Sequence, residues 1–406
     1  MTLGERTRAH LNAFDVLRLA AAFLVFWSHC FMLTGGDDPL LSRAGIAASE
    51  VGLMMFFAMS GFLVTRSWLS DPDWRAYARK RALRLMPALL VVVTLTAFVL
   101  GPLVTSFSLI SYFTDPQTYL YVVRNSLLLT PRANLPGVFT DNVFAFPNAV
   151  NGSLWTLPVE AGAYVAIAVA ASLFAGIRAR YALVVVAIGL VLLSPVVNLE
   201  VRIPVGTDGR FLPTIAELYV AFAVGALMWL ERDRLTLRWR YVALCIGALA
   251  LLRTSVWNDA AYALTIPYLT IFAAFRLPAA VRRLTDRTGD LSYGIYITAY
   301  PLQQTVAHVY GPSLGAWTMM VLAAPLIFVA AALSWHYVEK PALARKYRGA
   351  PAPETPGDVL APAGRRRAQP FRRYRPAPVT PEPAPLTGAV APAVQVSAVG
   401  AGDDVE

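Results

Sequence analysis

The stretch FDVLRLAAAFLVFWSHCFML, residues 14–33, decides the fold of this chain. Its length matches the roughly 20 apolar residues that cross the hydrocarbon core of a bilayer as a helix. The stretch nevertheless carries Asp15, Arg18 and His29. Polar side chains are costly inside a membrane helix, and they usually face a cavity or a partner helix. The stretch therefore predicts a spanning helix with one functional face.

The spacing of Arg18 and His29 defines that face. His29 follows Arg18 by eleven positions, a helical rotation of about 1100°, or three turns plus 20°, so both side chains lie on one side. The rise between them is about 16 Å, roughly half the hydrocarbon thickness. A cation near the membrane edge and a titratable imidazole deep inside indicate a reaction or transport path.

The composition is that of a polytopic membrane protein. The chain is 57% hydrophobic and 15% charged, with a mean hydropathy of +0.53, whereas soluble domains are about 25% charged. The net charge of +10 falls in short loops and the tail, so membrane topology explains it better than nucleic-acid binding. The two cysteines stand inside apolar runs, which argues against a disulfide framework or a thiolate metal site.

Basic residues separate the apolar runs in a regular way. Lys and Arg precede the first run and follow every even-numbered run, as the positive-inside rule requires of cytoplasmic loops. We therefore predict an all-α protein with ten transmembrane helices and both termini cytoplasmic, multi-pass in the inner (plasma) membrane. The runs are 13–34, 47–69, 83–105, 154–176, 181–199, 212–230, 240–256, 260–276, 289–310 and 315–338.

Two domains are predicted. Residues 1–348 form the transmembrane domain, and residues 349–406, rich in Pro, Ala and Arg, form a disordered cytoplasmic tail. The outer loop 106–152 is the longest, and residues 119–130 within it could form a short interfacial helix. This loop could be an acceptor-binding lip or a lid packed on the bundle.

His29 and Glu160 are the candidate catalytic residues. An imidazole titrates near neutral pH, so His29 could take a proton from an acceptor hydroxyl as a general base. Glu160 lies in the segment 151–164, which we expect to enter the membrane from outside at a depth similar to that of His29. A carboxylate there would orient the ring and stabilise its charged form. The alternative for both residues is a structural hydrogen bond between helices.

A cytoplasmic basic group consists of Arg66, Lys80, Arg81 and Arg84. Arg81-x-x-Arg84 stands at the start of the predicted third helix, where an i,i+3 pair shares a face. Arginine forks suit phosphate oxygens. Anchoring by the positive-inside rule is the simpler alternative for these side chains.

Aromatic residues are the remaining candidates. Tyr293, Tyr296 and Tyr300 follow i, i+3, i+7 spacing and form one stripe, a pattern more typical of packing than of binding. Trp155, Tyr293 and Tyr296 are the candidate substrate-binding residues. His336 and Glu339 are expected to be structural anchors. The chain has no Walker loop, nucleophile elbow or metal-ligand spacing, so we predict no metal and no permanently bound cofactor.

Taken together, these stretches resemble the acyltransferase-3 family of integral membrane O-acyltransferases. The resemblance implies about ten helices and the transfer of an acyl group, often acetyl, from acyl-CoA to hydroxyls of sugars in surface polysaccharides or glycolipids. One departure is Ala299, where many members have a histidine. The matching pieces, in family order from residue 14 to about 348, are FDVLRLAAAFLVFWSH, VGLMMFFAMSGFLVTR, Arg81-x-x-Arg84, SLWTLPVE, LSYGIYITAYP and SWHYVEKPAL.

The resemblance also implies residue roles. His29 becomes the catalytic base, Arg18 its partner in the motif and Glu160 a functional carboxylate. Arg81 and Arg84 become contacts to the phosphates of acetyl-CoA, the donor substrate, and Arg18, Arg66 and Lys80 complete the donor-binding set. Direct transfer and a covalent acyl-enzyme both remain open.

The rival function is a transporter or flippase in which Arg18, His29 and Glu160 form a relay. The chain shows no internal repeat of the kind that builds many transporters, which counts against this alternative.

Overall fold

A computed structural model of the 406-residue chain describes residues 1–8, 12–128, 133–140, 148–173, 211–285 and 288–345. In these ranges the protein is helical and contains no strand. The chain divides into two units, Met1–Arg348 and Gly349–Glu406. The second unit lies outside the described residues, so the disordered tail stays a prediction.

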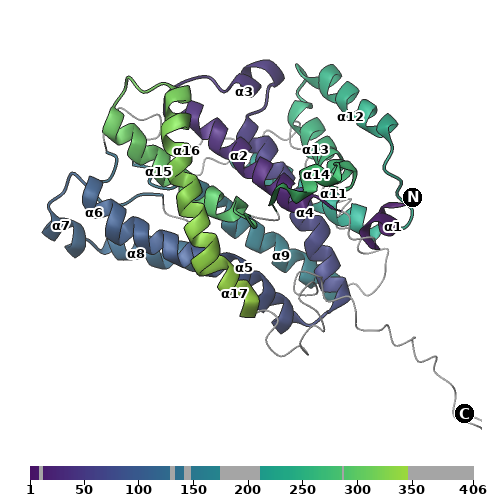
Figure 1. Ribbon diagram of the computed structural model, residues 1–406, viewed down its shortest axis with the longest axis horizontal. Helices are drawn as coiled ribbons and strands as arrows, with labels where there is room; N and C mark the ends of the chain where they lie inside the picture. The colour runs from purple at the N-terminus through teal and green to yellow at the C-terminus, as the bar shows by residue number, and fades with distance from the viewer. Residues whose placement is uncertain (9–11, 129–132, 141–147, 174–210, 286–287, 346–406) are drawn as a thin grey trace, which may run out of the picture. The chain divides into compact units, whose positions relative to one another are not determined.

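The helices of the first unit are labelled in Figure 1. Their bounds are α1 Leu3–Arg8, α2 Phe14–Leu33, α3 Pro39–Ala44, α4 Ala48–Ser70, α5 Trp74–Leu95, η1 Thr96–Leu100, α6 Gly101–Val104, α7 Leu109–Thr114, α8 Pro116–Ser126, η2 Gly152–Trp155, α9 Thr156–Leu173, α11 Phe211–Leu230, α12 Trp239–Leu252, α13 Asn258–Arg276, α14 Ala279–Arg282, η3 Arg283–Thr285, α15 Ser292–Tyr310, α16 Ala316–Ser334, η4 Trp335–Glu339 and α17 Lys340–Ala344.

Among the described residues, five helical segments are long and apolar enough to cross a membrane, and a sixth is added if α13 and the bent segment Ala279–Thr285 count as one span. These segments are Phe14–Leu33, Ala48–Ser70, Trp74–Val104, Gly152–Val169 and Ala316–Ala344. The ten predicted spans therefore stay a prediction.

The other predicted spans correspond to shorter or less apolar helices, or lie outside the described residues. Helices α11 and α12 contain shorter apolar segments, Thr214–Leu230 and Trp239–Leu252. Helix α15 is buried along most of its length, but it is outside the apolar set because its tyrosines and paired glutamines lower its hydropathy. The predicted span 181–199 lies outside the described residues.

Helix α5 begins earlier than the sequence suggested. The Asp73 side chain caps its N-terminus by accepting hydrogen bonds from the backbone N–H groups of Arg75 at 2.7 Å and Ala76 at 3.0 Å. Arg81 and Arg84 therefore lie about two to three turns inside the helix, and the prediction that they stand at its start is wrong. Arg84 reaches Asp290, just before α15, and Arg81 stacks on Tyr164 of α9.

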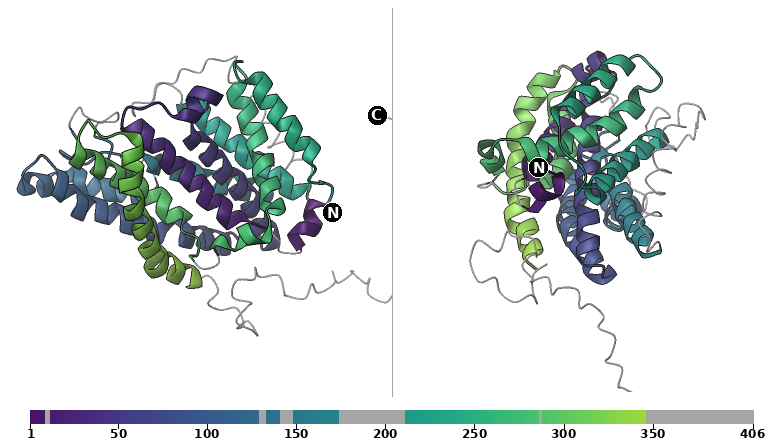
Figure 2. Two further views of the ribbon diagram at one scale, coloured as in Figure 1. Left: turned by 45° about the horizontal axis from the view of Figure 1, so that its top comes forward. Right: turned by 90° about the vertical axis from the view of Figure 1, so that its right-hand side faces the viewer.

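Helix α4 is at the centre of the bundle. It packs on α2, α9, α11 and α13, while α15 packs on α2 and α16. Figures 1 and 2 show α2 and α4 in the middle, with α15 and α16 on one side and α11 to α13 on the other. Residues from α2, α4, α5, α9 and α15 can therefore meet inside the bundle.

Two glycines allow α4 and α11 to approach closely. A Cβ atom at Gly61 would collide with the carbonyl oxygen of Phe222, and one at Gly225 would collide with that of Ala58. In both cases the obstacle is backbone, which cannot rotate away as a side chain can. Small residues at such crossings bring helix backbones into contact inside membranes.

We expect Gly61→Ala to lower the free energy of unfolding by about 1–3 kcal/mol, the usual cost of overpacking a tight interface. Thermal unfolding of the purified protein in detergent measures the change. Gly247→Ala is the matched control, because Gly247 lies in helix α12 and a Cβ atom there would have no heavy atom within 4 Å. Equal unfolding temperatures for the two variants would contradict the close approach of α4 and α11.

Candidate active site

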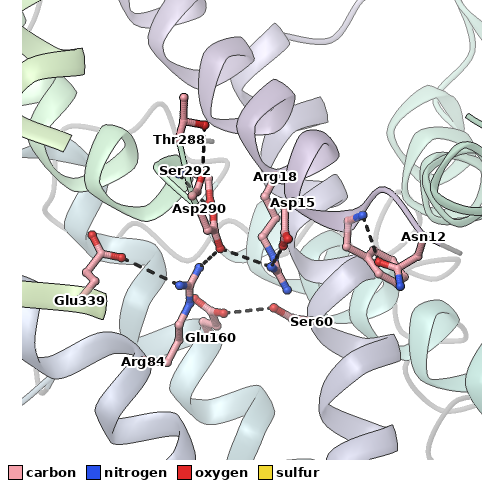
Figure 3. Close-up of polar contacts among 12 residues, drawn as sticks. Asn12, Asp15, Arg18, Ser60, Arg84, Glu160, Thr288, Asp290, Ser292 and Glu339 are labelled. Atoms are coloured by element: carbon pink, nitrogen blue, oxygen red, sulfur yellow. Dashed lines mark hydrogen bonds and ion pairs between the residues drawn. The ribbon is translucent and has the colours of Figure 1, made fainter. Parts of the chain in front are cut away.

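An ion-pair cluster ties three helices together at one end of the bundle. Asp290, in the turn before α15, accepts from Arg84 of α5 at 2.6 Å and from Arg18 of α2 at 3.3 Å, both at Oδ2 (Figure 3). Arg18 also donates to Asp15 at 2.8 Å. The carboxylate of Asp290 therefore joins the beginnings of α2 and α15 to α5.

Glu339 of η4 is the second carboxylate beside Arg84. It is 2% exposed, its Oε2 lies 3.9 Å from Arg84 Nη1, and its Oε1 accepts from the Ser334 hydroxyl at 2.9 Å. The Arg84 guanidinium carbon is also 5.8 Å from the centre of the Tyr293 ring. Arg84 thus has carboxylate partners on two sides, and Glu339 is more than the anchor that the sequence suggested.

The charges of Arg84 and Arg18, with a hydrogen bond from the Ser292 hydroxyl, favour the ionised form of the Asp290 carboxylate. Asp290 is thus ionised at neutral pH. Sequence reasoning missed this residue. The available signal was an aspartate at the start of the predicted span 289–310, at the end where the neighbouring loop is rich in arginine.

Glu160 of α9 lies near the same end. Its carboxylate accepts from the Ser60 hydroxyl of α4 at 3.1 Å (Figure 3). It also accepts from the hydroxyl of Tyr164. The Tyr164 ring in turn lies under Arg81, whose guanidinium carbon is 5.6 Å from the ring centre. Arg81 and Glu160 are therefore joined through Tyr164. Within the described residues, no carboxylate forms an ion pair with Arg81, and its Nε is buried without a partner.

His29 lies further along α2, in a different environment. The residue is 9% exposed, and its ring stands edge-on to Tyr300 of α15 with the ring centres 5.2 Å apart and an interplanar angle of 83°. Its Nδ1 is buried and has no hydrogen-bond partner in the part of the chain that the structure describes. Gln303 fixes α15 beside it by donating to the carbonyl of Phe26 at 3.0 Å.

These contacts agree with the predicted shared face of α2. Arg18 and His29 both face α15, through Asp290 and Tyr300 respectively. Because Asp290 and Tyr300 follow the same order in α15 as Arg18 and His29 in α2, the two helices run parallel. The polar face predicted from the spacing is therefore directed at one neighbouring helix.

The tyrosine stripe connects the two ends of this face. Tyr300 stacks over the position of Gly152, and the Tyr296 hydroxyl bonds to the carbonyl of Ser153 at 3.0 Å and to the Thr156 hydroxyl at 2.5 Å. These contacts are the helix packing that the spacing of the tyrosines favours. Because their order runs in opposite directions along the two segments, α15 is antiparallel to η2 and α9.

Tyr293 completes the stripe at the end nearest to Asp290. Its hydroxyl donates to the carbonyl of Leu85 at 2.8 Å, and it lies close enough to Glu160 for an electrostatic interaction. From Tyr293 to Tyr300 the helix rises by about 10 Å. Glu160 is therefore level with the Tyr293 end of the stripe, and His29 is level with the Tyr300 end.

The predicted contact between His29 and Glu160 is not formed among the described residues, where His29 contacts Tyr300 and Glu160 contacts Ser60 and Tyr164. The expectation of equal depth counted turns of α9 from the membrane surface. Asn151, however, is 2% exposed and donates to a carbonyl of α15 at 2.9 Å. The segment is therefore already inside the bundle before α9 begins.

The other predicted site residues lie elsewhere. Lys80 pairs with Asp71 at 2.9 Å near the surface, and Arg66 of α4 stacks on Trp229 of α11 with its guanidinium carbon 5.6 Å from the ring centre. Trp155 is partly buried against the main core. The described residues contain no group of three or more His, Cys, Asp or Glu that could hold a metal ion.

A multi-pass helical protein with a buried histidine and a buried arginine–carboxylate cluster is the class that fold and site define. Comparison with known sequences gives the family: a family model described as an acyltransferase domain matches residues 11–336. The chain belongs to this acyltransferase-3 family. Membership confirms the resemblance carried by the six sequence stretches.

Two curated relatives extend over most of the chain. An O-acetyl transferase of Shigella phage Sf6 is 30% identical over 339 residues, covering 82% of this chain and 96% of the phage protein. Nodulation protein 10 of Rhizobium leguminosarum bv. viciae is 28% identical over 361 residues, covering 84% and 95% of the two chains. No solved structure matches. Family and relatives support O-acyl transfer by a membrane protein.

Proposed function

We propose that this O-acyltransferase moves an acyl group, most simply acetyl, from acyl-CoA to a hydroxyl of a sugar in a surface polysaccharide or glycolipid. The name of the phage relative supports acetyl as the group transferred. We place the enzyme in the inner (plasma) membrane with ten spans and both termini cytoplasmic, as the distribution of basic residues suggests. Acyl-CoA would then approach from the cytoplasm.

One observation carries the proposal: a buried imidazole on the face of α2 that also bears Arg18. His29 has no ion-pair partner among the described residues, and its Nδ1 is free of hydrogen bonds there. About 16 Å of helix separates it from Arg18. A flexible donor that enters at the arginine end can present its reactive carbonyl near His29.

The proposed step is a direct transfer. His29 removes the proton of the acceptor hydroxyl, and the oxygen attacks the thioester carbonyl carbon as the new C–O bond forms. The C–S bond then breaks, and the imidazolium returns the proton to the departing thiolate, so that free CoA and an ester are the products. Tyr300 limits rotation of the imidazole by its edge-on contact with the ring.

The acceptor dependence of CoA release tests this function. Purified enzyme with acetyl-CoA should release thiol rapidly only when a suitable glycan is present. A transporter or flippase that uses the same buried residues as a relay would move substrate without consuming the thioester. Release of CoA at equal rates with and without every glycan would remove the support for a sugar acceptor.

Within the Arg81-x-x-Arg84 pair, Arg81 is the better candidate for contacting the phosphates of acyl-CoA. Arg84 is already engaged by Asp290 and lies near Glu339, so a phosphate there would meet two carboxylates. Arg18 likewise has carboxylate partners. Arg81 stacks only on tyrosine rings and keeps a buried Nε that is unpaired within the described residues. We assign the phosphate contact to Arg81 and a positioning role to Arg18 and Arg84.

We expect Arg81→Gln to raise the KM for acyl-CoA by roughly 10- to 100-fold with a small change in kcat, because a charge-assisted hydrogen bond to phosphate contributes about 1.5–3 kcal/mol. Steady-state kinetics over a range of acyl-CoA concentrations measures both constants. Arg75→Gln is the control, since Arg75 is exposed and stacks on Trp74 near the start of α5. An unchanged KM for Arg81→Gln in folded protein would contradict the assignment.

A further inference from the structure

A second group of arginines lies where α1, α4, α11 and α13 meet, apart from the cluster at Asp290, and two of its members stack on Trp229. Its base is an aromatic core in which the Phe62 ring packs edge-on against Trp229 at 5.2 Å and lies 5.9 Å from the Phe275 ring. Helix α1 is held here because the N–H of Gly4 donates to the carbonyl of Arg232 at 2.7 Å. Figure 1 shows α1 beside the ends of these helices.

The indole N–H of Trp229 is a buried hydrogen-bond donor without an acceptor among the described residues. The residue is 8% exposed, and its indole Nε1 has no hydrogen-bond partner there. Buried indole N–H groups usually find an acceptor. Two guanidinium groups share this ring: their central carbons are 5.6 Å from its centre for Arg66 and 4.3 Å for Arg232.

Arg6 adds a third donor that is only partly satisfied. Its Nη1 donates to the carbonyl of Phe275 at 3.1 Å, but its Nε is buried and unpartnered in the described residues. Burial and the neighbouring charge of Arg276 lower the pKa of Arg6. Arg276 itself donates to the carbonyl of Leu237 at 2.7 Å. Arg6 and Arg276, which lie at the end of α13 in this group, therefore add N–H donors and positive charge.

The charges of this group are not balanced within the described residues. Asp233 contacts Arg232 at 3.5 Å and Arg8 at 3.4 Å. Arg6, Arg66 and Arg276 have no carboxylate partner in that part of the chain, although Arg66 is close enough to Arg232 for the like charges to interact. Like charges held together are unfavourable unless an anion lies between or beside them.

Anchoring at the membrane edge does not require this arrangement. An arginine that only marks the cytoplasmic side extends its head into water. Here the Nε of Arg6 and the indole N–H of Trp229 are buried, and the guanidinium of Arg66 lies against an aromatic ring. The two unsatisfied atoms of this group are both donors, which selects for a ligand that only accepts hydrogen bonds.

We infer that Arg6, Arg66, Trp229, Arg232 and Arg276 form a binding site for a phosphate group. Phosphate oxygens accept several hydrogen bonds, match the planar fork of arginine and carry the charge that the site lacks. Two sources have this chemistry: the headgroup of an anionic phospholipid and the nucleotide phosphates of acyl-CoA. The site does not depend on the proposed reaction, because binding requires no acceptor and no turnover.

Two binding measurements on the purified full chain distinguish the sources. Native mass spectrometry after exchange into detergent with phosphatidylglycerol reports retained lipid. Calorimetry with adenosine 3′,5′-bisphosphate, which carries phosphates of the CoA nucleotide, measures binding of the nucleotide phosphates. Whichever ligand binds, we expect Arg66→Gln combined with Arg276→Gln to weaken it at least 10-fold.

Two further variants make the result interpretable. Trp229→Phe keeps an aromatic side chain but removes the N–H donor, and we expect it to weaken binding of the ligand about 5-fold. This variant tests the site even if the double arginine variant does not fold. Arg234→Gln is the control, because Arg234 is 85% exposed and pairs with Glu231 at 3.5 Å. Lipid or nucleotide binding that falls in the site variants and not in the control supports the site. Failure of both ligands to bind, or binding unchanged by all variants, overturns it.

Discussion

Replacing His29 with alanine should lower acceptor-dependent release of CoA by about 10²- to 10⁴-fold, the usual contribution of a positioned general base. The ring is buried against Tyr300, and the proton of the acceptor hydroxyl has no other proposed destination. The rate of thiol release with saturating acyl-CoA and glycan measures the loss. His336→Ala should leave the rate unchanged, since His336 is exposed at the end of the last spanning segment.

The alanine variant also removes a packed ring, so folding must be checked separately. Unfolding temperatures of His29→Ala and His29→Gln equal to that of the wild type would show that the bundle tolerates the change. Both variants should be inactive, because neither a methyl group nor an amide is a base at neutral pH. Undiminished release by a folded His29→Ala protein would contradict the role of His29 and would require another base.

Replacing Asp290 with asparagine should lower the free energy of unfolding by about 3–5 kcal/mol, the cost of removing one partner from a buried ion pair. The carboxylate is 10% exposed and joins α2, α5 and the start of α15, so its loss leaves Arg84 and Arg18 near each other without their shared anion. Thermal unfolding in detergent measures the effect. Asp71→Asn removes a surface partner of Lys80 and should cost no more than about 1 kcal/mol.

The sequence was sufficient for the features that depend on local spacing. Residues 14–33 form one helix, and the eleven-residue separation correctly placed Arg18 and His29 toward one neighbour. The tyrosine stripe of α15 also follows its helical spacing and packs as expected. Such patterns are set by the geometry of a single helix, so they can be read without knowing what surrounds it.

Features that depend on distant partners could not be predicted in this way. Arg84 meets Asp290, which is 206 positions away, and no local pattern marks that pair. Glu160 is deeper than expected because the polypeptide enters the bundle before α9 begins. The sequence suggested that Arg66 and Arg81 belong to one basic group. In the structure Arg66 of α4 stacks on Trp229, whereas Arg81 of α5 stacks on Tyr164.

Transfer of label from acetyl-CoA is the most direct test of the central claim. The purified enzyme, reconstituted in lipid, would be incubated with acetyl-CoA labelled in its acetyl group and with candidate surface glycans. The account predicts that label appears on the glycan as an ester and that one free CoA is released for each acetyl group transferred, with both signals lost in His29→Ala. Movement of glycan or protons across the membrane without any release of CoA would contradict the account and favour a transporter.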